Sequence, residues 1–115
     1  MSINRTITAT TTIPLLNASE GRPSSWAVQF IGSDTPSYSI VVQKRTTVPT
    51  GVTAGTYVPG HYVLDLTGAV TSGGSAIVVT TTATNIRIPS DGCDVALVCT
   101  KTTGTLAVNA NPITE

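Results

Sequence analysis

Apolar and polar side chains alternate with a period of two along much of the chain, which is the pattern of β-strands with one buried face. The clearest runs are Ser25–Ile31, Ser37–Arg45, His61–Gly68, Ser75–Thr82 and Asp94–Thr100. Turn residues separate such runs at spacings of about 8–12 residues, which is typical of two packed sheets. The pattern therefore predicts an all-β fold, an antiparallel β-sandwich of jelly-roll or Ig-like type with about eight strands and no long helix.

The same alternation predicts which side chains are buried between the two sheets. Within each run, side chains two positions apart share a face, and the apolar set is expected to point inward. The predicted core consists of Trp26, Val28, Phe30, Ile40, Val42, Tyr62, Leu64, Leu66, Ile77, Val79, Val95, Leu97, Leu106 and Val108.

Clusters of turn-forming residues separate the predicted strands. Gly32–Pro36 lies between the first two strong runs, which we interpret as an antiparallel hairpin with a longer loop. Near the end of the chain, the turns Pro89–Gly92 and Lys101–Gly104 divide the sequence into three short extended runs. Proline, aspartate and glycine favour turns for separate reasons, so these runs are predicted to form a closing meander.

Two segments outside these runs are candidates for contacts with other molecules. Residues 1–12 are predicted to form a strand or an extended N-terminal arm, in which Ile3 and Ile7 share a face. The loop Thr46–Gly60 is long for a compact domain, and such loops usually carry function or are disordered. We expect the arm and the loop, through Ile3, Ile7 and Tyr57, to contact other copies of the chain or a partner, whose sheet edge can pair with the arm.

Length and composition narrow the class of protein. The 115 residues form one domain by size, spanning residues 1–115. Charged residues make up 10% of the chain and the formal net charge is zero, which is typical of proteins packed against other copies. Nucleic-acid binding is not expected because it needs clustered Lys and Arg. No apolar run reaches the roughly 20 residues of a membrane helix, and residues 1–12 lack a secretory signal, so we expect synthesis in the cytoplasm.

Groups that could carry chemistry are few. His61 is the one histidine and lies four residues from Asp65 on the outward face, but a hydrolase also needs a nucleophile held against the base. One histidine and two cysteines do not supply a zinc site, and calcium prefers about six to eight oxygen ligands. We therefore expect no enzyme, no cofactor and no metal.

The two cysteines, Cys93 and Cys99, lie six residues apart in an extended run. Their Cα atoms are then roughly 20 Å apart, which is too far for a disulfide between them. Two interpretations remain open. The thiols are reduced and serve as small core residues, or they form disulfides between copies in an assembled particle exposed to air.

The second half of the chain contains the runs Tyr62–Leu66, Gly73–Val79, Asn85–Pro89 and Asp94–Val98 in that order. The residue pattern and the order of these runs resemble those of small β-sandwich virion proteins of tailed bacteriophages. Those proteins serve as capsid decoration (cement) proteins, neck components or fibre subunits. The resemblance implies a structural role in the virion, most specifically that of a capsid decoration protein. Its partners would be other copies of itself and a capsid or tail protein, and it brings no catalytic residues.

The alternative is a carbohydrate- or receptor-binding module of a phage tail or fibre. Such a module would need an exposed cluster of aromatic side chains on which a sugar can stack. Trp26 alternates with Val28 and so is expected in the core, whereas Tyr57 is the aromatic residue that we expect on the surface.

Overall fold

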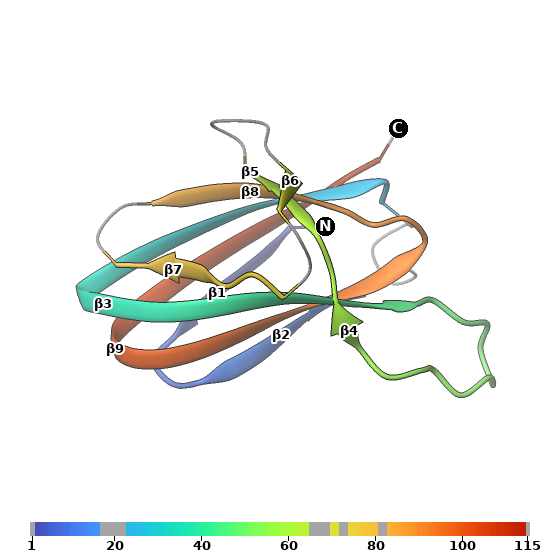
Figure 1. Ribbon diagram of the computed structural model, residues 1–115, viewed down its shortest axis with the longest axis horizontal. Coiled ribbons are helices and arrows are strands. Elements are labelled where there is room, and N and C mark those ends of the chain that lie inside the picture. Colours follow the sequence, from blue (N-terminus) through green and yellow to red (C-terminus); the bar gives the residue numbers. More distant parts are fainter. Residues whose placement is uncertain (1, 17–22, 65–69, 72–73, 81–82, 115) are drawn as a thin grey trace.

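The computed structural model describes residues 2–16, 23–64, 70–71, 74–80 and 83–114. These residues form nine strands, all paired antiparallel, and no helix, so the predicted all-β antiparallel fold is confirmed (Figure 1). The strands are β1 (Ile3–Ile7), β2 (Thr11–Leu15), β3 (Ser25–Thr46), β4 (Val58–Pro59), β5 (Tyr62–Leu64), β6 (Val70–Thr71), β7 (Ile77–Val79), β8 (Thr84–Pro89) and β9 (Cys93–Ile113).

Two long strands, β3 and β9, form the frame of the molecule. They pair along nearly their whole length, from Ser25 opposite Ile113 to Thr46 opposite Cys93. A straight strand with the 22 residues of β3 would be roughly 70 Å long, whereas the longest dimension of the molecule is 43 Å. The paired strands must therefore fold back, and Figure 1 shows their bend at the left of the view.

The bend divides one continuous sheet into two facing layers. In the first layer, β1 pairs with the end of β9, and β8 pairs with the start of β3 and continues to β5 and β6. In the second layer, β2 pairs with the start of β9, while β7 and β4 pair with the later part of β3. Buried side chains from both layers form one hydrophobic core between them.

The bend lies where the sequence predicted turns. Between Ser33 and Ser37 the pairing with β9 shifts register, and Asp34, Thr35 and Gly104 all have positive φ. The predicted hairpin of residues 25–31 with 37–45 is therefore wrong, because both runs pair with β9 and not with each other. The second turn of the predicted meander is likewise a bend inside β9, since a positive-φ glycine can bend a strand without reversing it.

The turn between β8 and β9 agrees with its prediction. The amide of Cys93 donates a hydrogen bond of 2.8 Å to the carbonyl of Ser90, which closes a tight turn. Its central residues, Asp91 and Gly92, have φ values of 51° and 72°. Two successive positive φ angles define the type I′ turn for which Asp-Gly is a preferred pair.

The predicted core is confirmed at every position whose side chain the structure describes. The buried set also includes Ile7, Ile13, Leu15, Tyr38, Ile86, Ile88, Cys99 and Ala110. Two predicted members, the side chain of Leu64 and residue Leu66, lie outside the described part of the chain. In β9 the positions that face the core are odd-numbered before the bend and even-numbered after it, because the register shift exchanges the two faces. Asp94 and Ala96, on the opposite face before the bend, are buried as well.

Candidate interaction surfaces

The N-terminal residues lie in the protein's own sheet. Strand β1 pairs with residues 106–110 of β9, and β2 pairs with residues 95–99 of the same strand. Ile7 is buried, with 4% of its surface exposed, and Ile3 packs against the core. In this conformation both predicted contact residues are occupied within their own chain, so contact with a partner would require β1 to leave the sheet.

The free edges of β1 and β2 are poorly suited to receive another strand. Arg5 places an exposed charge on β1, and Pro14 removes one backbone donor from β2. Charged residues and prolines on edge strands oppose the pairing of further strands. The broad faces of the two layers are therefore better candidates for binding surfaces than these edges.

The outer face of the second layer carries no charge over most of its width. Cross-strand pairs place Thr12 beside Val98, and Val98 beside Val41. Val78 on β7 pairs with Ser39 and is 66% exposed. We call the following residues the neutral face: Thr12, Pro14, Ser39, Val41, Val78 and Val98. They occupy strand positions that alternate with buried ones, so their side chains point away from the core.

Tyr57 lies where the neutral face meets a polar cluster. The guanidinium carbon of Arg45 lies 4.4 Å from the centre of the Tyr57 ring, within the range of a cation–π contact. Arg45 Nε is 3.6 Å from Asp94 Oδ2, and the Thr47 hydroxyl donates to Asp94 Oδ1 at 3.2 Å. Burial raises the pKa of Tyr57. The ring is half-buried against Arg45, so the predicted exposure of this aromatic residue is only partial.

The loop between β3 and β4 begins at this polar cluster. Residues 47–57 extend beyond the two layers at the right of Figure 1. The amide of Thr47 donates to the carbonyl of Gly92 at 3.1 Å, which ties the base of the loop to the β8–β9 turn. Val52 is 55% exposed, so the loop presents an apolar side chain to solvent.

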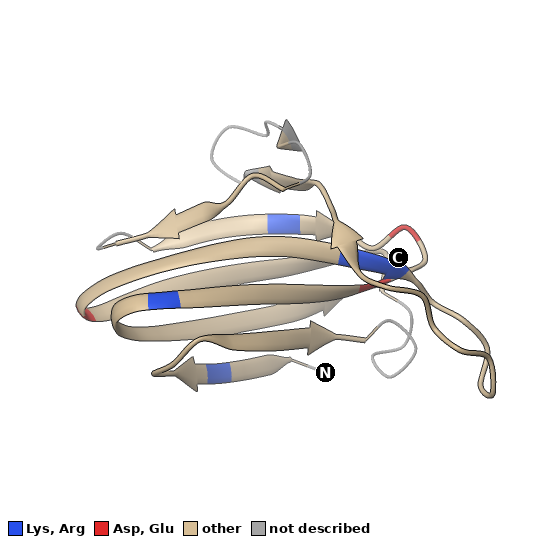
Figure 2. Cartoon of the chain, turned by 60° about the horizontal axis from the view of Figure 1, so that its bottom comes forward, with Lys and Arg blue, Asp and Glu red and all other residues tan. Residues whose placement is uncertain are grey.

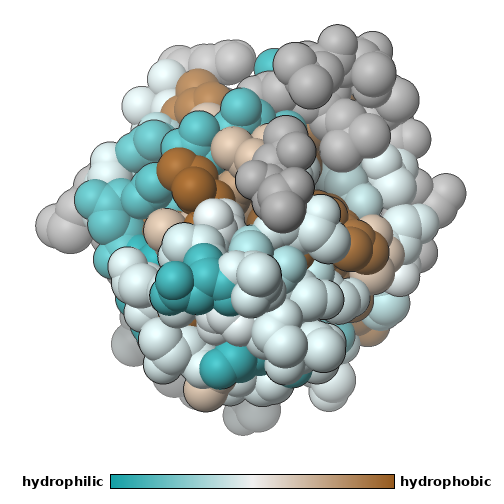
Figure 3. All heavy atoms as spheres, turned by 90° about the vertical axis from the view of Figure 1, so that its left-hand side faces the viewer, coloured by the Kyte–Doolittle hydropathy of each residue, from teal (hydrophilic) through white to brown (hydrophobic). Residues whose placement is uncertain are grey.

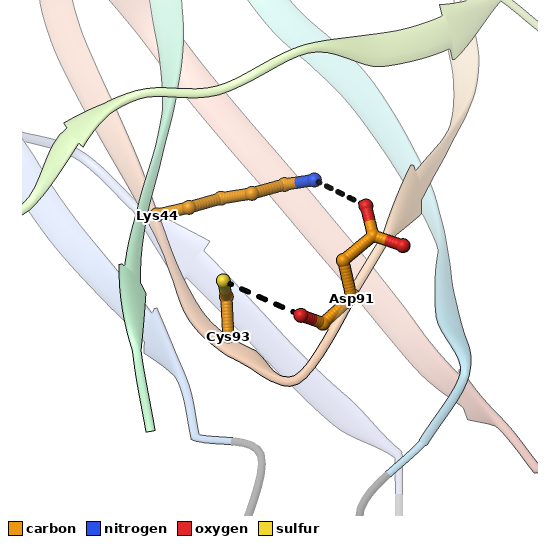
Figure 4. Close-up of polar contacts among 3 residues, drawn as sticks. All are labelled: Lys44, Asp91 and Cys93. Atoms are coloured by element: carbon orange, nitrogen blue, oxygen red, sulfur yellow. Dashed lines mark hydrogen bonds and ion pairs between the residues drawn. The ribbon is translucent and has the colours of Figure 1, made fainter. Parts of the chain in front are cut away.

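A second polar contact, at the same end of the molecule, joins β3 to the β8–β9 turn (Figure 4). Lys44 Nζ lies 3.8 Å from Asp91 Oδ2, and the stem of Lys44 covers Gly60, where an added Cβ would come within 2.7 Å of Lys44 Cγ. Burial lowers the pKa of Lys44, while the nearby Asp91 and Cys93 act in the opposite direction. The arrangement fixes a strand end to a turn, and its lysine is 8% exposed, so we read it as a structural contact.

Charged residues are otherwise scattered over the described surface, as Figure 2 shows. Lys44, Arg45, Asp91 and Asp94 gather at the end opposite the bend, and the remaining charges stand apart on separate strands. Figure 3 views the molecule from the bend and shows mostly pale and teal residues with a few separate brown ones. The described surface therefore has neither a basic stripe nor a wide apolar patch at the bend.

The described residues do not gather into a metal site, and the predicted pair of His61 and Asp65 stays untested. His61 is half-buried at the start of β5, and its predicted neighbour Asp65 lies outside the described residues. No three His, Cys, Asp or Glu residues of the described part gather around a point that could hold a metal ion. The described residues also include no helix long and apolar enough to span a membrane.

The aromatic platform that a sugar-binding module was expected to use is not on the surface. Trp26, Phe30, Tyr38 and Tyr62 are all buried, and Tyr57 is half-buried against Arg45. These five are all the aromatic residues of the chain. A saccharide would therefore have to be bound by hydrogen bonds more than by stacking.

The outer face of the first layer carries a group of amide side chains that the sequence analysis missed. One row across four strands consists of Asn4, Asn109, Gln29 and Asn85, each paired with the next. In the adjacent row, Ser2 donates a hydrogen bond to Asn111 Oδ1, and Asn111 pairs with Ala27. A shallow hollow on this face is lined by Ala27, Val28, Gln29, Asn85, Asn109 and Asn111. The one signal in the sequence is the alternation of Asn109, Ala110 and Asn111.

Comparison with known proteins finds one solved structure with a similar fold. No family model matches the sequence, and no curated protein matches it. The crystal structure of the SPBc2 prophage-derived protein YomS is similar, with a TM-score of 0.56 and 12% sequence identity. The match covers 96% of this chain and 92% of that one. At this identity, the likeness shows that the two chains share a fold.

Proposed function

We propose that this chain is a non-enzymatic structural protein of a bacteriophage particle. It acts by packing against other copies of itself and by docking on a capsid or tail protein, and its most specific role is that of a capsid decoration protein. The observation that carries the proposal is the neutral face, made by Thr12, Pro14, Ser39, Val41, Val78 and Val98. The fold shared with a prophage-derived protein over nearly the whole chain supports the bacteriophage origin.

The neutral face suits permanent contact with a protein surface. Desolvating a charged side chain is costly, and this face has none to desolvate. Valine, threonine and proline side chains on a sheet form a stiff surface that loses little conformational freedom on contact. With a net charge of zero, binding depends on the area buried and not on electrostatic steering, so moderate salt should weaken it little.

The first test is an inventory of purified virions by mass spectrometry. The phage that encodes this chain should carry it as a particle component that survives washing in moderate salt. Its absence from purified virions, with the protein present in the infected-cell lysate, would contradict the proposal.

The second test asks whether the neutral face makes the contact. Val78→Asp adds a charge at a side chain that is 66% exposed, so the fold should persist and particle incorporation should fall. Thr6→Asp is the matched control, because Thr6 is exposed on the outer face of the first layer. Both purified variants are compared with wild type by circular dichroism and by gel analysis of virions. Equal incorporation of Val78→Asp and Thr6→Asp would exclude the neutral face as the docking surface.

A further inference from the structure

We infer that the amide-lined hollow on the outer face of the first layer is a binding site for a neutral saccharide. The hollow lies where β8, β3 and β9 run side by side, with Asn85, Gln29 and Asn109 paired across the three strands. This inference goes beyond the proposed structural role and does not depend on it, because the neutral face belongs to the other layer.

The hollow exists because a small residue stands among longer ones. Ala27 pairs with Asn111 on one side and with Arg87 on the other, and Gln29 follows two positions along the same strand. Facing side chains on neighbouring strands are about 5 Å apart and those two positions along a strand about 7 Å apart. These spacings leave room over the methyl group of Ala27 for one six-membered ring, whose C–H face can rest on that methyl group.

The chemistry of the lining selects the ligand. The residues that line the hollow include no charged side chain and no large apolar one that faces outward, although Arg87, which pairs with Ala27 from β8, stands beside the hollow. A phosphate or carboxylate would meet Arg87 on one side but no counter-charge among the lining residues, and an apolar ligand would cover polar amides without replacing their hydrogen bonds.

Hydroxyl groups are the ligand groups that match the four amide side chains of the lining, which belong to Gln29, Asn85, Asn109 and Asn111. Each amide offers two N–H donors and one carbonyl acceptor, and a sugar hydroxyl both donates and accepts. Several such amides around one ring can bond neighbouring hydroxyls at the same time. A neutral saccharide is the ligand class whose hydrogen-bonding pattern this lining complements.

Binding at a single hollow is expected to be weak. The amides are open to water, so each hydrogen bond gained replaces one with solvent and its net contribution is small. A dissociation constant on the order of 1 mM is the appropriate scale for such a site. Several copies of the chain held close together would bind a polysaccharide surface more tightly through avidity.

Titration of the uniformly ¹⁵N-labelled protein with glucose, galactose and N-acetylglucosamine tests the inference by nuclear magnetic resonance. At least one of these sugars should shift the side-chain amide resonances of Gln29, Asn85, Asn109 and Asn111 along a saturable curve. Sodium phosphate at the same ionic strength serves as the control ligand and should leave them unchanged. If none of the three sugars shifts these resonances at concentrations up to about fifty times the expected dissociation constant, the inference is wrong.

Two variants locate the binding event. Ala27→Leu fills the floor of the hollow and should weaken binding at least about tenfold, and Asn85→Ala provides a second test on a more exposed side chain. Asn4→Ala is the matched control, because Asn4 belongs to the same amide row but does not line the hollow. Unchanged affinity in a folded Ala27→Leu or Asn85→Ala protein would place the sugar elsewhere and overturn the inference. A failed titration of a protein found in virions would refute this site alone, and absence from virions would refute the structural role alone.

Discussion

Gly104 and Ser33 touch across the bend of the two long strands. A methyl group on Gly104 would come within 2.7 Å of the Ser33 carbonyl oxygen, and within 2.6 Å of the Cα atom of Pro36. Gly104 also has a φ of 82°, in a region that other residues rarely adopt. The bends of β3 and β9 therefore interlock at a position that only glycine fits, and this contact holds the two layers at their common turn.

Replacing Gly104 with alanine should destabilise the fold. The positive φ costs about 1–2 kcal/mol for an L-residue, and the clash with backbone atoms adds a further 1–3 kcal/mol or so. We expect the free energy of unfolding of Gly104→Ala, measured by urea denaturation, to fall by about 2–4 kcal/mol. Gly51→Ala is the control, because Gly51 has a φ of 90° but no atom within 4 Å of the added methyl group. If both variants lose the same stability, the interlock contributes nothing beyond the backbone angle.

Tyr38 ties the N-terminal strand to the same bend. Its hydroxyl lies 3.1 Å from the carbonyl oxygen of Ile7 and 3.0 Å from that of Gly104, and it can donate to either. The ring is buried, with 1% of its surface exposed. The end of β1 and the bend of β9 therefore share one buried donor.

Removal of that donor should weaken the fold without disturbing the packing. Tyr38→Phe leaves two carbonyl oxygens without this partner, and we expect a loss of about 1–3 kcal/mol in urea denaturation. Tyr62→Phe is the matched control, since the Tyr62 hydroxyl is 3.4 Å from the carbonyl of Ser75 and bonds it weakly. If Tyr62→Phe lost as much stability as Tyr38→Phe, the hydrogen bonds of the Tyr38 hydroxyl at the bend would contribute no more than the weak bond of Tyr62.

The hydrophobic alternation predicted the core well but not the connections. Trp26, Ile40 and Leu97 were placed correctly because period-two alternation reports which side of a strand is buried. The segment Gly32–Pro36 was assigned to a hairpin because the residues that allow a reversal are the same ones that allow a bend in a continuous strand. Only the partner strand decides between the two, and β9 is distant in sequence.

The surfaces were harder to predict than the core. Ile3 and Ile7 were expected to bind a partner, since a terminal segment with two isoleucines gives no sign of which surface will bury them. The structure places both against the protein's own core. Gln29, Asn85 and Asn109 come from three separate strands, and their row exists only once the cross-strand register is known.

Cys99 is expected to make the fold sensitive to alkaline pH. Its side chain is fully buried, and burial raises the pKa of its thiol from 9.0 to about 11, with Arg5 acting in the opposite direction. The unfolded chain releases this proton near pH 9, whereas the folded protein holds it until about pH 11. In this window the unfolded state binds fewer protons, so the thiol's contribution is complete below pH 9 and is lost as the pH rises.

The free energy of unfolding should fall by about 1 kcal/mol between pH 8 and pH 10, since one pKa unit corresponds to about 1.4 kcal/mol. Burial also raises the pKa values of Tyr38 and Tyr57 above 10.0. The range from pH 8 to pH 10 therefore lies below the pH at which these two tyrosines contribute most to the alkaline loss of stability. Urea denaturation at both pH values, with a reductant present, should show the loss in wild type and not in Cys99→Ala. Cys93→Ala is the matched control and should keep the loss, because Cys93 is only half-buried. An equal alkaline loss in wild type and Cys99→Ala would mean that the thiol of Cys99 is not its source.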